Sequence, residues 1–216
     1  KDIKSIEGLQ HLENLERLDI WSGLGGVNEI SDISVLSELT NLKNLDFAGN
    51  EVSDISPLAN LTNLNRLTFD GNNVADITPL KNLTNLQFFH FSRNKVSDIS
   101  SLENLTNLKS LRFNNNNVSD ITPLKNLTNL QSLDFVRNQV SDVGPLTNLT
   151  NLKWLNFNGN NVSDITPLEN LTDLENLDFA SNEVDNITAL INNEGLNEGD
   201  KIDMRDNALD LSEGSE

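Results

Sequence analysis

The sequence predicts an α/β solenoid in which a parallel β-sheet lines the concave face and short 3₁₀ helices or turns line the convex face. Three observations support this fold class. A unit of 22 residues recurs with few changes along most of the chain. Each unit contains a short alternation of apolar and polar residues, which is typical of a strand. Five units carry a proline in the turn that follows. Because such a unit buries its apolar face only against its neighbours, we expect residues 1–216 to form one elongated domain.

The composition narrows the classes of function. The formal net charge is −18, with acidic residues spread along the chain, which disfavours binding to nucleic acid or anionic lipid. The chain has no cysteine, so we expect neither a disulfide framework nor a thiolate metal site. No apolar run in the sequence approaches the ~20 residues that cross a bilayer. We therefore expect no cofactor, no nucleic-acid partner and no membrane insertion, and we expect a monomer.

The apolar–polar alternation of each unit is interpreted as a strand. In the unit around residues 66–70, Leu67 and Phe69 are predicted to point inward, whereas Arg66 and Thr68 point outward. Nine such strands follow from the same register, and together they make a sheet roughly 40 Å long at ~4.8 Å per strand. Seven of the nine phenylalanines share the last inward position, so we expect them to stack as a spine. The residues at this position are Ile20, Phe47, Phe69, Phe91, Phe113, Phe135, Phe157, Phe179 and Met204.

Two polar positions of the unit are expected to have structural roles. An asparagine follows each strand, and its amide can both donate to and accept from the backbone of neighbouring turns, which predicts a buried ladder. These residues are Asn50, Asn72, Asn94, Asn116, Asn138, Asn160, Asn182 and Asn207.

In seven units an aspartate comes just before Ile-Ser/Thr-Pro or a close variant, and it is expected to be the N-cap of a short 3₁₀ helix. These residues are Asp32, Asp54, Asp76, Asp98, Asp120, Asp142 and Asp164. A calcium ladder is the alternative, but it needs more oxygen ligands at each centre than one aspartate per unit supplies.

Insertions interrupt the repeat at two places. Near residues 21–27, five extra residues make a glycine-rich segment that carries Trp21, Leu24 and Val27. We interpret this segment either as a bulge that the solenoid tolerates or as a binding loop. The terminal repeat, residues 191–216, is also modified.

Binding residues are expected among the outward strand positions, which the repeat leaves free. All six arginines of the chain fall on the predicted strands or at their exits. Arginine and aromatic residues are enriched at protein interfaces, and a partner would explain an exposed Phe88 and Trp154 on a polar sheet. The alternative is a set of scattered surface residues without a role. We call the candidate protein-binding residues the concave patch: Phe88, His90, Arg93, Arg112, Val136, Arg137 and Trp154.

Catalysis is not predicted. His90, Arg112 and Asp134 fall in one outward column, but an open sheet neither excludes water nor surrounds a substrate. The chain has two histidines and no cysteine, and no nucleophile–base pair or metal cluster is evident from the sequence. We therefore assign no catalytic residues and no metal ligands.

The repeat also resembles a known family. The unit Leu-x-x-Leu-x-x-Leu-x-Phe-x-x-Asn-x-Val-Ser-Asp-Ile-x-Pro-Leu-x-x-Leu is similar to the 22-residue leucine-rich repeat of bacterial internalins over residues 30–190. The resemblance implies a horseshoe of about nine repeats whose concave sheet binds a protein ligand. It also implies a secreted or surface-attached bacterial protein. Two other functions stay open: an inert spacer or scaffold array, natural or engineered, and an intracellular regulatory leucine-rich repeat protein.

Overall fold

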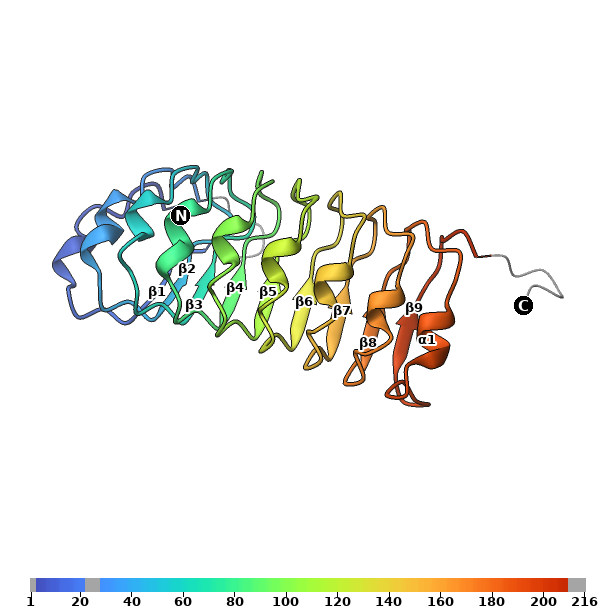
Figure 1. The fold of residues 1–216 in the computed structure, drawn as a ribbon. Coiled ribbons are helices and arrows are strands. Elements are labelled where there is room, and N and C mark those ends of the chain that lie inside the picture. Colours follow the sequence, from blue (N-terminus) through green and yellow to red (C-terminus); the bar gives the residue numbers. More distant parts are fainter. Residues whose placement is uncertain (1–2, 22–27, 210–216) are drawn as a thin grey trace.

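The computed structural model describes residues 3–21 and 28–209. In these residues, nine strands of three residues each form one parallel sheet whose spatial order follows the chain order (Figure 1). The strands are β1 (Arg17–Asp19), β2 (Asn44–Asp46), β3 (Arg66–Thr68), β4 (Phe88–His90), β5 (Ser110–Arg112), β6 (Ser132–Asp134), β7 (Trp154–Asn156), β8 (Asn176–Asp178) and β9 (Lys201–Asp203).

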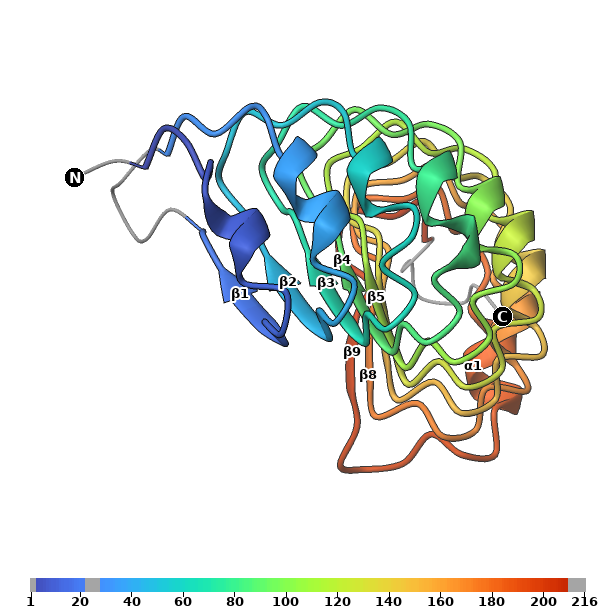
Figure 2. The same ribbon diagram turned by 90° about the vertical axis from the view of Figure 1, so that its left-hand side faces the viewer.

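Short helices lie on the side of the solenoid opposite the sheet (Figure 2). The 3₁₀ helices are η1 (Leu9–His11), η2 (Ser34–Glu38), η3 (Ser56–Leu58), η4 (Thr78–Asn82), η5 (Ser100–Leu102), η6 (Thr122–Leu124), η7 (Gly144–Leu146) and η8 (Thr166–Leu168). The last turn contains a five-residue α-helix, α1 (Thr188–Asn192). None of the helices in the described ranges is long and apolar enough to cross a membrane. The predicted solenoid, with its sheet on the concave face and 3₁₀ helices on the convex face, is confirmed.

The strand register is uniform despite the two insertions. Arg17 pairs with Asn44 across the segment near residues 21–27, and Asn176 pairs with Lys201 across the modified terminal repeat. The described strands therefore keep one register on both sides of each insertion. Because equivalent positions pair from β1 to β9, each position of the unit becomes a continuous row of side chains along the solenoid.

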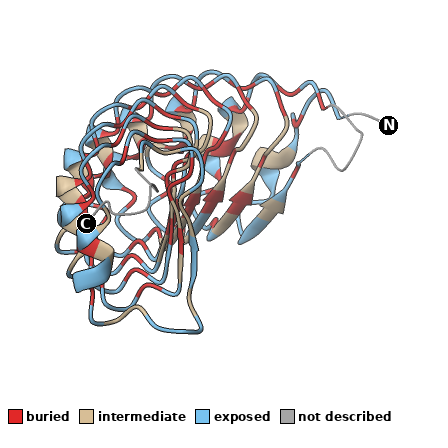
Figure 3. Cartoon of the chain, turned by 90° about the vertical axis from the view of Figure 1, so that its right-hand side faces the viewer, coloured by how far each residue is buried: buried red, intermediate tan, exposed pale blue. Residues whose placement is uncertain are grey.

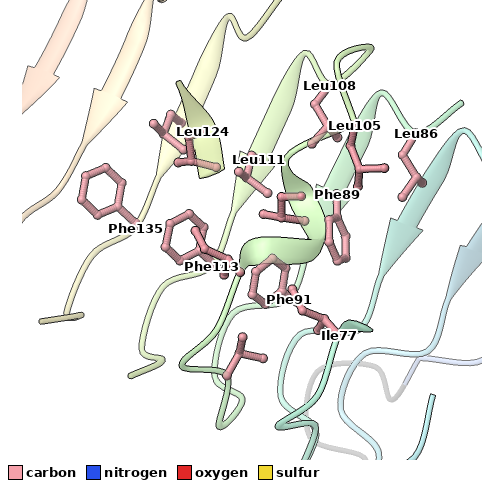
Figure 4. Packing of buried hydrophobic residues seen from close by; sticks show 14 of the residues in the cluster. Ile77, Leu86, Phe89, Phe91, Leu105, Leu108, Leu111, Phe113, Leu124 and Phe135 are labelled. Carbon is pink, nitrogen blue, oxygen red and sulfur yellow. The ribbon is translucent and has the colours of Figure 1, made fainter. Parts of the chain in front are cut away.

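The inward rows form one continuous apolar core, seen as the buried segments between sheet and helices in Figure 3. The seven phenylalanines of the predicted spine are 0 % exposed. Their ring centroids follow one another at 5.4 to 5.9 Å in stacked geometry, so the spine is confirmed. Phe89 takes an inward leucine position and lies 4.7 Å from the ring of Phe91 (Figure 4). At the two ends of the column, Ile20 is buried and Met204 is half-buried.

The buried asparagines join each turn to the one before it. The Nδ2 of Asn116 donates to the carbonyl oxygens of Phe91 and Phe113 at 3.1 and 3.0 Å, and its Oδ1 accepts from the N–H of Val96 at 3.0 Å. The other predicted members repeat this pattern, which confirms the ladder. Asn28, directly after the first insertion, forms a further rung that the sequence analysis did not include.

The aspartates before the turns lie one residue earlier than predicted. Helix η3 has Ile55 at its N-cap position, without a side-chain hydrogen bond, and the Oδ1 of Asp54 accepts from the N–H of Ser56 at 2.8 Å. The other six aspartates make the same bond. The N-cap prediction was wrong because the cap position points inward and must be apolar: Ile55 is 1 % exposed. The aspartate instead closes an Asx turn, and its bond to the backbone of Ser56 holds the pKa of Asp54 below its ordinary value.

Replacing Phe113 by alanine should lower the free energy of unfolding by ~3–5 kcal/mol, because its ring is fully buried in the spine and the substitution leaves a cavity. Urea unfolding measures the loss. Phe88→Ala is the matched control, since Phe88 is an outward, half-buried phenylalanine and should cost much less. A loss below about 1 kcal/mol for Phe113→Ala would contradict the role of the spine.

Ser101 departs from the repeat in a way that should cost stability. It occupies the position that is proline in η3, η4, η6, η7 and η8, and its Oγ is buried without a hydrogen-bond partner among the described residues. Ser101→Pro should therefore raise the free energy of unfolding by about 1–2 kcal/mol in the same urea assay. Ser101→Ala removes the hydroxyl alone and should give a part of this gain. A less stable proline variant would show that the η5 backbone differs from that of the other turns.

Candidate binding surface

The outward strand positions form two rows across the concave face. The first row, from β1 to β9, is Arg17, Asn44, Arg66, Phe88, Ser110, Ser132, Trp154, Asn176 and Lys201. The second row is Asp19, Asp46, Thr68, His90, Arg112, Asp134, Asn156, Asp178 and Asp203. Carboxylates occupy both ends of the second row, whereas His90 and Arg112 lie at its centre. The second row is thus acidic at its ends, whereas Arg112 supplies a positive charge near its centre, beside Asp134.

The two aromatic residues of the concave patch lie apart in the first row. Phe88 and Trp154 are separated by Ser110 and Ser132, which places their backbones three strand spacings, or about 14 Å, from each other. Phe88 is half-buried, and the guanidinium of Arg66 lies 4.3 Å from its ring centroid, a cation–π contact. A ligand that touches both aromatic side chains must therefore span at least four strands.

Trp154 lines a shallow hollow toward the C-terminal end of the sheet. The hollow has a volume of about 220 Å³, and its walls include Trp154, Asn176, Lys201 and Ile202. Trp154 is 46 % exposed and Ile202 is 37 % exposed. Ile202 was not predicted as a surface residue, because its position in the unit is inward, as is that of Leu177, which is 2 % exposed. In the described residues β9 is the last strand, so no further repeat covers Ile202.

A second hollow brings together two arginines of the concave patch. It has a volume of about 380 Å³ at the exits of the strands, and we call it the arginine hollow. It is lined by Gly49, Asp70, Gly71, Ser92, Arg93, Arg112, Asn114 and Asn115. Val136 lies beside it, where its N–H donates to the Oδ1 of Asn114 at 2.7 Å. Arg137 follows on the same turn as an exposed side chain.

The centre of the second row is a hydrogen-bonded and charged cluster. The Nε of Arg112 lies 3.3 Å from the Oδ2 of Asp134, so the predicted column of His90, Arg112 and Asp134 is confirmed. Burial raises the pKa of Asp134 above its ordinary value. Burial, and then the charges of Arg112 and Arg66, lower the pKa of His90 from its ordinary 6.5 to about 4. His90 is therefore neutral at neutral pH.

His90 and Ser110 form a pair that the sequence analysis did not foresee, because adjacent strands bring them together. The Nε2 of His90 lies 3.1 Å from the Oγ of Ser110, which is the distance of a nucleophile–base pair. A base whose pKa is about 4 is weak, and its charged neighbour is an arginine where a hydrolase uses a carboxylate. Among the described residues, no three His, Asp or Glu side chains are placed to hold a metal ion. The arrangement is suited to hydrogen bonding and anion binding.

The predicted loop near residues 21–27 is described in part. Trp21 lies at the exit of β1 and is 51 % exposed, three strands from the start of the concave patch at β4. The backbone there is tied down, since the carbonyl of Ile20 accepts hydrogen bonds from Asn28 and Asn50. Leu24 and Val27 lie outside the described residues, so the binding loop stays a prediction.

The titration of His90 should reveal its environment. Its NMR resonances should titrate with a midpoint of about 4, because burial and the neighbouring guanidinium groups oppose its charge. The pKa of His90 is lower in the folded chain than in the unfolded chain. The unfolded chain therefore binds more protons at this residue between pH 6.5 and about 4. As the pH falls through this window, His90 lowers the free energy of unfolding. His90→Asn should therefore gain stability relative to the native chain over the same window. A midpoint near 6.5 would contradict the buried position.

Comparisons with known proteins agree with this architecture. A family model described as leucine-rich repeats (2 copies) matches residues 40–82, 84–126 and 150–192. No curated protein sequence matches the chain significantly. Among solved structures, internalin C2 from Listeria monocytogenes is 30 % identical with a TM-score of 0.81, over 87 % of this chain and 81 % of that chain.

Two further structures are similar. An internalin, InlF, from Listeria monocytogenes is 33 % identical with a TM-score of 0.61, over 96 % of this chain and 72 % of that chain. The plant peptide hormone receptor RGFR1, solved in complex with RGF2, is 25 % identical with a TM-score of 0.77, over 93 % of this chain and 34 % of that chain. The family model covers more than half of the sequence, and the likeness to internalin C2 extends over most of both chains. The chain therefore belongs to the leucine-rich repeat family, in its internalin-type form with repeats of 22 residues.

Proposed function

We propose that the chain is a non-enzymatic domain that recognises a protein ligand through its concave sheet. The observation that carries the proposal is the exposure of Trp154 and the arginines on a face whose other outward residues, apart from Phe88, are small or polar. The stability of the solenoid depends on the inward rows, so it does not account for a tryptophan that is 46 % exposed. Large aromatic side chains and arginines carry much of the binding energy at protein interfaces.

The similar structures support a binding role and a location outside the cell. One of them is a receptor in complex with RGF2, and two are internalins of Listeria. We propose on this basis that the chain is secreted or attached to a bacterial surface. We also propose that it acts as a monomer, since a net charge of −18 makes copies of the chain repel one another.

The non-enzymatic part of the proposal rests on the second row. His90 has a lowered pKa, faces Ser110 and has Arg112 as its neighbour, so it is a poor general base. The surrounding sheet is open, and the hollows beside it are shallow, which leaves a bound substrate in contact with water. An inert spacer is the competing function, and the near-identity of the repeats favours it.

A pull-down with three baits (the native chain, a concave variant and a convex control) separates binding from the spacer function. The native chain should retain a protein that the variant Phe88→Ala, Arg112→Ala, Trp154→Ala does not retain, because the variant removes the aromatic and cationic contacts of the concave face. The matched control is Lys81→Ala, Lys125→Ala, Ile191→Ala, which truncates three side chains of the convex face, where Ile191 is 75 % exposed.

The retained protein then allows a quantitative test. Trp154→Ala alone should weaken its binding by about 2 kcal/mol in isothermal titration calorimetry, while the midpoint of thermal unfolding stays nearly unchanged. Equal retention by all three baits would favour the spacer. A large loss of thermal stability in Trp154→Ala would show that the side chain serves the fold.

A further inference from the structure

We propose that the arginines of the concave patch bind the carboxylates of an acidic, extended segment of the protein ligand. The proposal rests on the function proposed above and names the chemistry of its ligand. It depends on the pairing of the arginines, on their backbone conformation and on the residues that line the arginine hollow.

Pairing distinguishes Arg17, Arg112 and Arg205, each of which makes an ion pair with an aspartate, from the other three arginines. Arg17 bonds Asp19 at 2.8 Å, and Arg205 bonds Asp203, so each end arginine is neutralised by the residue two positions away. In the part of the chain that the structure describes, Arg66, Arg93 and Arg137 make no ion pair. These cations stay unpaired in a chain with 33 acidic and 15 basic residues. They are therefore available to an anion from a partner.

The backbone at two of these arginines favours glycine. Arg93 and Arg137 have φ angles of 55° and 53°, and the equivalent position is glycine in three other turns: Gly49, Gly71 and Gly159. The position has one backbone role throughout, since the N–H of Arg93 donates to Asn114 at 2.7 Å, as that of Gly71 donates to Ser92. A side chain in the left-handed region is strained, and arginine gains nothing there from a local hydrogen bond as asparagine does. The fold alone thus favours glycine over either arginine.

The arginine hollow brings two arginines together. Arg93 and Arg112 line it from adjacent turns, and Gly49, Gly71 and Asp70 are also among its lining residues. Arg112 uses its Nε toward Asp134, and a guanidinium carries five N–H donors, so others remain for a ligand. The nearby carboxylate of Asp70 accepts from the N–H of Ser92, and burial raises its pKa.

Arg137 extends the site by one turn. The aliphatic part of the Arg137 side chain packs beside Gly159. A Cβ placed on Gly159 would lie 3.3 Å from the Cγ of Arg137, so a larger residue at position 159 would crowd this side chain. Arg93 and Arg137 are two turns apart, about 10 Å, which an extended peptide covers in about three residues. A segment that crosses the strands with two such carboxylates can contact both arginines. The net charge of −18 repels a nucleic acid or an anionic membrane more strongly than a short segment with two carboxylates, because the repulsion grows with the number of negative charges on the partner.

The test is selection of random peptides of about 12 residues, displayed on phage, against the full chain. The selected peptides should be enriched in aspartate and glutamate. Their affinity should fall about tenfold or more in Arg93→Gly, Arg137→Gly, and it should weaken as salt rises from about 0.05 M to about 0.5 M. This variant restores the glycine of other turns, so its thermal stability should rise while its binding is lost.

Two controls isolate the charge and its position. Lys81→Gln, Lys125→Gln removes two positive charges from the convex face and should leave the affinity within about twofold. Ser181→Gly places glycine at the same left-handed position outside the arginine hollow and should not change binding.

Three results would overturn the proposal. Peptides without acidic enrichment that lose binding in Trp154→Ala would refute the acidic ligand and leave the concave binding face in place. Selected peptides that bind the native chain and every concave variant equally would refute both the acidic ligand and the concave binding face. A native chain that retains no peptide would also count against the site.

Discussion

The fold depends on the hydrogen bonds of the buried asparagines. Where each strand ends, the chain turns inside the solenoid, and its backbone groups cannot reach water or a sheet partner there. The amide of Asn116 supplies two donor contacts and one acceptor contact to these groups and so links two successive turns. Asn28 performs the same role after the first insertion. The phenylalanines of the spine can stack in register because these hydrogen bonds keep the spacing between successive turns constant.

A solenoid built in this way separates stability from recognition. The inward rows and the asparagines carry the packing energy, and each inward phenylalanine contacts its neighbours at a nearly constant distance. The outward rows carry little of that energy, so Trp154 and the arginines are free to differ from one repeat to the next. Arg93 and Arg137 lower the stability of the fold, because arginine is strained in the left-handed backbone conformation of these positions. A stability–binding trade-off at these two positions is what a recognition surface on a rigid array would produce.

The sequence was sufficient to predict most of the fold and only a part of the candidate site. A strict period carries the strand register, so the buried Phe89 and the column of His90, Arg112 and Asp134 were predictable. The N-cap was misplaced by one residue because propensity favours aspartate at a cap, whereas the packing of Ile55 required an apolar residue there. The His90–Ser110 bond depends on side-chain directions across two strands, which periodicity does not report.

The solenoid, its spine, its ladder and the set of outward side chains all follow from the amino-acid sequence, because each corresponds to a position within one repeated unit. The grouping of those side chains depends on the three-dimensional fold. The fold joined Arg93 and Arg112 in one hollow, placed His90 against Ser110, and exposed Ile202 on the last strand of the described residues. The reason is physical: grouping depends on distances between neighbouring turns and on burial at the ends of the array. A repeat pattern specifies positions along the chain, not the space between side chains.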